Sequence, residues 1–144
     1  MNIKDCVTFA TQNPVCFLAT ADGDQPRVRP VLLFIADNEG FYFVLLSPKD
    51  MFKQLKTNPK VEVCFYNSAA DLSLAKSMRI TGRMEVVQDA ELRKRALQER
   101  GFLEAIIGRP LEPILQVCRI HTGEGFFWTM ADALKEHELE RIGF

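Results

Sequence analysis

The sequence predicts a mainly β fold with peripheral helices. Most of the chain consists of short apolar or alternating segments, separated by turn sequences such as Asp22-Gly23 and Asp37-Asn38-Glu39-Gly40. Residues 41–46 and 61–66 are almost wholly apolar, and closure of a sheet into a barrel would bury such strands on both faces. No repeat, low-complexity tract or linker divides the chain, so we expect a single domain over residues 1–144.

Seven segments have the pattern of strands. They are residues 15–21, 25–31, 41–46, 61–66, 74–87, 114–121 and 125–130. In the long fifth segment, Gly82 is expected to mark a bend or a bulge, as glycine does in small barrels. Glu124-Gly125 is expected to lie near the turn that precedes the last strand.

Helical patterns occupy the connections between strands. A first helix over residues 3–11 is stopped by Asn13-Pro14. Residues 89–100 form an amphipathic helix that ends at Gly101, and its charge run is expected to be a solvated face. A shorter helix is expected over residues 103–107.

Cations flank a predicted helix start. Alternation in the second strand places Arg27 and Arg29 on one face. A helix is expected to begin with Ser47 as its N-cap, with Lys49 and Lys53 one turn apart on it. Because the first amides of a helix have no partner within the helix, this cluster predicts a site for a phosphate ester. The alternative is that these cations are ordinary surface residues.

Composition restricts the possible partners. With 144 residues, of which 47% are hydrophobic, the chain can bury a sizeable core. A net charge of −1 and a pI near 6.1 give no general attraction to nucleic acid or to an anionic membrane. No signal sequence and no apolar run of membrane-span length are visible, which predicts a cytoplasmic protein without a membrane segment.

Neither the cysteines nor the histidines have metal-site spacing. The four cysteines are scattered among apolar neighbours, without a CxxC pair, and are expected to be reduced core residues. His121 and His137 match no ligand pattern, so no metal is expected. No nucleophile elbow or phosphate-binding P-loop is present, and the catalytic residues stay unassigned.

The order of these elements resembles the pyridoxamine 5′-phosphate oxidase-like FMN-binding split barrels. The resemblance covers most of the chain and is carried by an ordered set of segments. They are Phe17-Leu18-Ala19-Thr20, Gln25-Pro26-Arg27-Val28-Arg29-Pro30, Phe41-Tyr42-Phe43, the run from Lys53 to Val63, and Arg79-Ile80-Thr81-Gly82-Arg83-Met84. The likeness implies a six-stranded antiparallel split β-barrel that binds FMN at the interface of a homodimer.

The likeness also implies roles for individual residues. Arg29 matches the arginine that grips the FMN phosphate, and Pro30 and Val31 match the backbone that lines the flavin. Ser77 falls where a polar side chain reaches the cofactor, and Trp128 resembles a late tryptophan near it. For Trp128 the alternative is a core or interface side chain.

Two departures separate the chain from the true oxidases. The family's basic pair near the helix start would fall at Asp50 and Met51, so the second phosphate cation is expected to be Lys49 or Lys53. The C-terminal residues 132–144 lack the arginine and histidine cluster that binds the substrate phosphate. Oxidation of pyridoxamine phosphate is therefore not expected.

Four functions stay open at this point. The leading one is an FMN-dependent oxidoreductase that moves electrons from a reduced nicotinamide to a small organic acceptor. The second is a flavin-binding or stress-related protein without turnover. The third is the same barrel with a deazaflavin or with haem, for which His121 is the candidate axial ligand. The fourth is a structural dimer without a cofactor.

Overall fold

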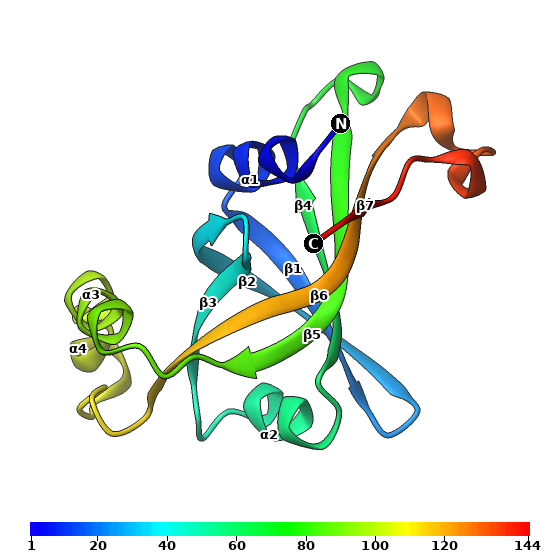
Figure 1. Ribbon diagram of the computed structural model, residues 1–144. Coiled ribbons are helices and arrows are strands. Elements are labelled where there is room, and N and C mark those ends of the chain that lie inside the picture. Colours follow the sequence, from blue (N-terminus) through cyan, green and yellow to red (C-terminus); the bar gives the residue numbers. More distant parts are fainter.

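Six strands close into an antiparallel barrel in the computed structural model, which describes residues 1–144 (Figure 1). They are β1 (Val15–Asp22), β2 (Gln25–Asp37), β3 (Gly40–Leu46), β4 (Lys60–Tyr66), β5 (Lys76–Val86) and β6 (Leu115–Thr129). Their order is β3-β2-β1-β4-β5-β6, and pairing of β3 with β6 closes the ring. A short β7 (Ile142–Gly143) is added beside β6. The predicted split β-barrel is confirmed.

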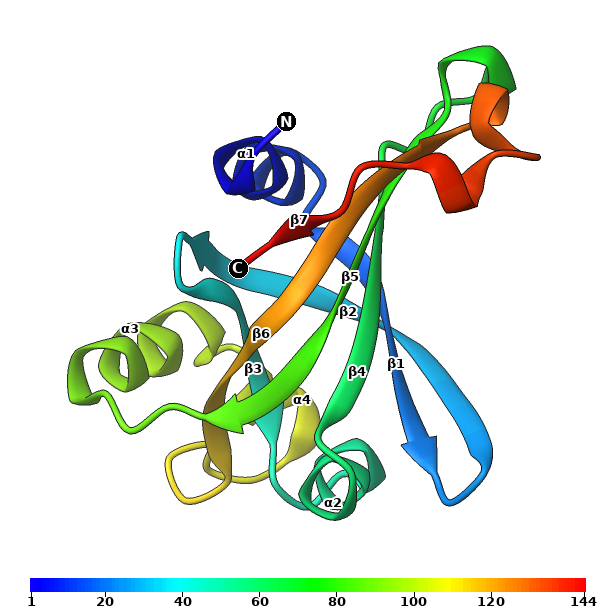
Figure 2. The ribbon, with the colours of Figure 1, turned by 45° about the vertical axis from the view of Figure 1, so that its right-hand side comes forward.

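The helices lie outside the barrel (Figures 1 and 2). They are α1 (Ile3–Gln12), α2 (Asp50–Thr57), α3 (Ala90–Arg100) and α4 (Leu103–Ile107). The view in Figure 2 shows α2 beneath one end of the barrel, near the β1–β2 turn, with α3 and α4 together on one side. No helix is long and apolar enough to cross a membrane.

Side chains fill the barrel interior. The main core cluster has 21 buried residues, among them the fully buried Phe41, Phe43 and Phe65. A small barrel packed in this way leaves no room for a planar cofactor inside it. A second buried cluster, which includes Ala96 of α3 and Leu111, fixes α3 against β3 and β6. Any ligand must therefore bind on the outside.

The barrel is split along one edge of β2. Residues Gln25–Leu32 pair with β1, but pairing with β3 extends only from Leu33 to Asp37. The Leu33 N–H donates to Pro14 O on the β1 side. Because antiparallel strands direct alternate residues to opposite edges, Leu32, Pro30 and Val28 point their backbone groups to the open edge. Proline, which has no N–H, suits such an edge.

The predicted alternation of β2 is confirmed. Arg29 and Val31 are half-buried on one face, whereas Val28, Pro30 and Leu32 are exposed on the other.

The predicted N-cap of the second helix is wrong. Helix α2 begins at Asp50, with Lys49 as its N-cap, and Ser47 lies within the preceding turn, which the Lys49 N–H closes by donating to Leu46 O. The Ser47 amide is held by Ile114 O, so Ser47 continues the end of β3 and does not start the helix. The amides of Asp50 and Met51 still have no backbone acceptor, as expected for a helix start.

The predicted turn at Glu124-Gly125 is also wrong. Strand β6 runs without interruption for 15 residues, because its first half pairs with β3 and its second half continues along β5. The expected irregularity at Gly82 is confirmed, since the β5–β6 register shifts between Thr81 and Arg83. Across from it, a Cβ on Gly123 would lie 1.8 Å from Thr81 O, so the strands approach too closely for any side chain.

We expect Gly123→Ala to destabilise the fold by at least about 2 kcal/mol, because the strands at the bulge must separate to admit the methyl group. Gly143→Ala is the matched control, since a Cβ there meets nothing closer than 4.0 Å. Urea denaturation of both variants measures the difference, and equal stability would contradict the role of the bulge.

Candidate functional site

Arg29 is held by neutral acceptors alone. Its Nη1 donates to Thr20 Oγ1 at 2.8 Å, and its Nη2 donates to Gln54 Oε1 at 2.9 Å. The Thr20 hydroxyl, on a side chain only 4% exposed, donates in turn to Gln54 Oε1 at 2.7 Å. Burial and the nearby Arg27 lower the pKa of Arg29, but arginine stays charged at neutral pH.

No carboxylate lies within ion-pair distance of Arg29, so its charge is not compensated inside the chain. Arg27, in contrast, pairs with Asp22 at 3.3 Å, and Lys53 lies 3.8 Å from Asp50. Both pairs are largely exposed and contribute little energy. Among the predicted cations, Arg29 is thus the one that is oriented by its neighbours and left without a counterion.

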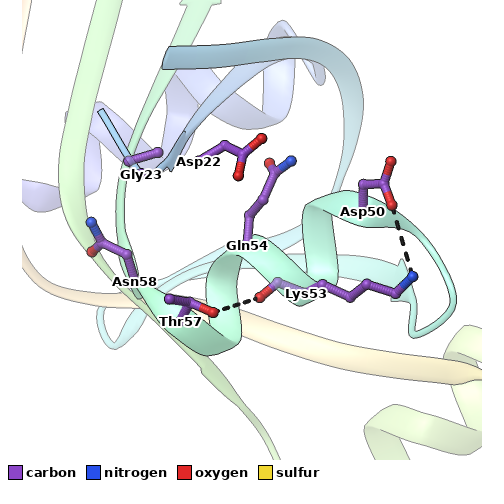
Figure 3. Close-up of a pocket in the computed structure, with 8 residues that line it drawn as sticks. Asp22, Gly23, Asp50, Lys53, Gln54, Thr57 and Asn58 are labelled. Carbon is purple, nitrogen blue, oxygen red and sulfur yellow. Dashed lines mark hydrogen bonds and ion pairs between the residues drawn. The ribbon is translucent and has the colours of Figure 1, made fainter. Parts of the chain in front are cut away.

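A polar cleft separates α2 from the β1–β2 turn, and Figure 3 shows its side chains. It has a volume of about 570 Å³ and is lined mainly by Asp22, Gly23, Asp50, Lys53, Gln54, Thr57 and Asn58. The carboxylates of Asp22 and Asp50 would repel an anion bound in this cleft. Although Lys53 and Gln54 both line the cleft, it therefore does not have the positive charge expected of a phosphate site.

A second hollow, called here the split groove, lies where β2 and β3 part. It has a volume of about 270 Å³. Its lining is Pro30, Val31, Leu32, Val44, Leu45, Leu46, Lys49, Met51, Arg100, Phe102 and Leu103. Eight of these residues are hydrophobic, the two cations form no ion pair, and no carboxylate is present. The structure thus brings the predicted residues Pro30, Val31 and Lys49 together at this groove. Pro30 and Val31 directly follow Arg29 in the chain.

Ser77 and Trp128 do not join this group. They face each other across β5 and β6, and both are half-buried. Strands β1 and β4 lie between β5 and β2, which corresponds to ~14 Å across the sheet. Trp128 also alternates with Phe127, which belongs to the barrel core, so it faces outward.

An apolar face without a partner covers the outside of β1 and β2. Val15 and Phe17 of β1 are 59% and 46% exposed, and Val28 and Leu32 of β2 are 69% and 44% exposed. The register places Val15 beside Leu32 and Phe17 beside Pro30, so these side chains are contiguous. A continuous exposed apolar patch is typical of an interaction surface.

No side chain in the described chain has the environment of a nucleophile. All four cysteines are free, and burial raises the pKa of Cys16 and of Cys118 to about 12. His121 Nε2 lies 3.5 Å from Glu85 Oε2, and its Nδ1 lies 2.8 Å from Thr122 Oγ1. His121 lines neither the cleft nor the split groove.

Several residues at these sites were not predicted from the sequence, and four of them matter most for the site. Thr20 and Gln54 orient Arg29, and Arg100 and Phe102 line the split groove. A usable signal for Thr20 is its place in the alternation of β1, on the same inward face as the buried Cys16 and Leu18. Arg100 was included in a charge run expected to be solvated.

The chain belongs to the pyridoxamine 5′-phosphate oxidase family, whose model matches residues 3–129. No curated protein sequence matches the chain significantly.

Solved structures with the same fold differ in function. A NimC/NimA family protein from Clostridium acetobutylicum is 28% identical, with a TM-score of 0.75, over 99% of this chain and 92% of that one. The haem storage protein HutZ from Vibrio cholerae is 17% identical, with a TM-score of 0.64, over 90% and 95% of the two chains. An FAD-binding protein from Mesorhizobium loti is 20% identical, with a TM-score of 0.62, over 90% and 96%.

We expect Thr20→Val to cost about 1 to 3 kcal/mol of stability, because it removes the buried hydroxyl that accepts from Arg29 Nη1 and donates to Gln54 Oε1. Thr57→Val is the control, since that exposed hydroxyl makes only one long bond, of 3.4 Å, to Lys53 O. Thermal denaturation compares the stabilities of the two variants. An equal loss of stability in both would show that the hydrogen bonds around Arg29 do not depend on Thr20.

Proposed function

We propose that the chain binds FMN, with the phosphate held by Arg29, Lys49 and the free amides at the start of α2. The observation that carries this proposal is the half-buried, uncompensated guanidinium of Arg29, whose next two residues in the chain, Pro30 and Val31, line the split groove. Neutral acceptors orient Arg29 without cancelling its charge, which suits a dianionic ligand. Lys49 is favoured over Lys53 because it lines the groove and has no carboxylate partner.

The split groove suits the ring of the flavin. Its apolar walls can cover a planar aromatic system, and the open edge of β2 supplies the Leu32 N–H as a donor and the Leu32 and Pro30 carbonyls as acceptors. One edge of the flavin ring carries both carbonyl and N–H groups, which complement such a strand edge. FMN is favoured over FAD, since nothing beside Arg29 is prepared for an adenylate.

We propose that a second copy of the chain completes the site. The exposed face of β1 and β2 provides an apolar surface for a homodimer. The dimer would bring the partner's Ser77 and Trp128 toward the groove, since one chain keeps them apart from Arg29. Four free cysteines fit the reducing cytoplasm, where we place the protein.

The proposed activity is oxidoreductase chemistry, in which electrons pass from a reduced nicotinamide to a small organic acceptor. The bound flavin would supply the hydride chemistry. The residues of the chain would anchor the phosphate, orient the ring and exclude water. Oxidation of pyridoxamine phosphate is not proposed, because Arg141 in the tail stacks 3.7 Å from the Phe126 ring and His137 is exposed beside Glu138.

Haem is the second candidate, favoured by the likeness to HutZ. An axial ligand needs a free imidazole nitrogen, and both nitrogens of His121 already have neighbours. A deazaflavin with an acidic tail would need a broader basic surface than the split groove has. A flavin carrier without turnover differs from the oxidoreductase only in that NADH would not bleach the bound flavin.

We expect the wild type to bind FMN more tightly than riboflavin. We expect Arg29→Ala to lower the affinity for FMN by at least about tenfold, or ~1.4 kcal/mol. Arg27→Ala is the control, because Arg27 already has Asp22 as its partner. Titration by flavin fluorescence measures all three affinities. Equal affinity of the wild type for FMN and riboflavin, or an unchanged Arg29→Ala variant that is folded, would overturn the phosphate site.

We expect Val28→Asp to convert the dimer to monomers and to reduce FMN affinity, because it places a charge in the proposed apolar interface. Leu134→Asp is the control, since Leu134 is 92% exposed in the tail, away from that face. Analytical ultracentrifugation gives the oligomeric state. A Val28→Asp variant that stays dimeric with intact FMN affinity would exclude this face as the interface.

A further inference from the structure

We propose that the corner between α3 and α4 is the second wall of the flavin site, with Phe102 covering the ring and Arg100 supplying its cation. The proposal rests on FMN binding in the split groove. It assigns a role to a part of the chain that the sequence indicated only as a solvated helix and a short helix after it.

The corner is held in place by the core. Ala96 of α3 is fully buried, and the Arg93 side chain donates to Leu115 O and Glu112 O on the segment that leads into β6. In the first turn of α4, Glu104 Oε1 accepts from the Leu111 N–H at 2.9 Å. These contacts fix both ends of the corner, so Arg100 and Phe102 keep their position at the groove.

Arg100 is the uncompensated cation of α3 that lines the split groove. Arg95 pairs with Glu99 at 2.8 Å, and Arg93 lies 3.9 Å from Glu112. Arg100 forms no ion pair, and no acidic residue lines the groove that it enters. Lys49, at the α2 side of the same groove, is likewise unpaired. An occupant that is apolar and gains negative charge complements this lining.

Phe102 is 61% exposed, although it lines an apolar groove with Leu103. An aromatic side chain in this position can stack on a planar ring and remove both surfaces from water. The volume of about 270 Å³ is below the ~300–1,000 Å³ of complete small-molecule sites, so the groove fits one part of the cofactor, the ring.

The charge of Arg100 has a consequence for the flavin. Reduction of the ring by two electrons with uptake of one proton adds one negative charge to it. A cation beside the ring attracts this charge, so Arg100 should favour the reduced flavin over the oxidised one. Arg100 would therefore raise the midpoint potential of the bound cofactor.

The test combines flavin affinity with potentiometry on the full chain. We expect Phe102→Ala and Arg100→Gln each to lower the affinities for FMN and for riboflavin by the same factor, about threefold or more, because the ring is common to both ligands. We expect Arg100→Gln to lower the affinity for reduced FMN about tenfold more than the affinity for oxidised FMN, which lowers the two-electron midpoint potential by ~30 mV. Arg100→Lys should restore most of the potential.

Arg109→Gln is the matched control, because Arg109 is exposed beyond α4 and lines no part of the groove. It should change neither affinity nor potential. If the wild type binds FMN but Arg100→Gln and Phe102→Ala keep its affinity and potential, the inference is overturned and FMN binding stands. A loss confined to FMN, with riboflavin unaffected, would assign Arg100 to the phosphate and also overturn it. A wild type that binds no flavin would overturn the proposed function as well.

Discussion

Strand β2 pairs with β1 over Gln25–Leu32 and with β3 only from Leu33 onward, and this break in the barrel determines where a ligand can bind. The interior is filled by side chains such as Phe41 and Phe65, so it cannot admit one. The break leaves backbone groups of β2 open and parts the ends of β2 and β3 enough to form the split groove. Helix α2 begins at the same place, which adds unpaired amides and Lys49 to one end of the groove.

The charge distribution follows the same division. Half of the arginines of the chain form ion pairs with carboxylates, as Arg119 does with Glu39 and Glu85. Arg29 is held only by neutral acceptors, of which Thr20 and Gln54 lie closest, so its charge stays available for an external partner. The outward faces of β1 and β2 are apolar and exposed next to this cation. A dimer that covers them would both bury the patch and enclose the proposed cofactor, so assembly and binding are expected to be coupled.

Much of the fold could be predicted from local patterns. The first helix, the faces of β2 and the bulge at Gly82 follow from periodicity and from glycine chemistry, which act over a few residues. The start of α2 and the continuity of β6 could not, because Ile114 O holds Ser47 and because β3 and β5 both pair with β6. Gln54 and Arg100 were missed for a similar reason, since their partners lie more than 20 residues away or in a groove that only the closed barrel creates.

The most direct measurement of the central claim is native mass spectrometry of the protein purified without added ligand. If each chain holds a flavin at its split groove and a second copy encloses it, the protein should be a dimer that carries two FMN molecules. A monomer free of ligand, or a dimer that carries haem, would contradict it.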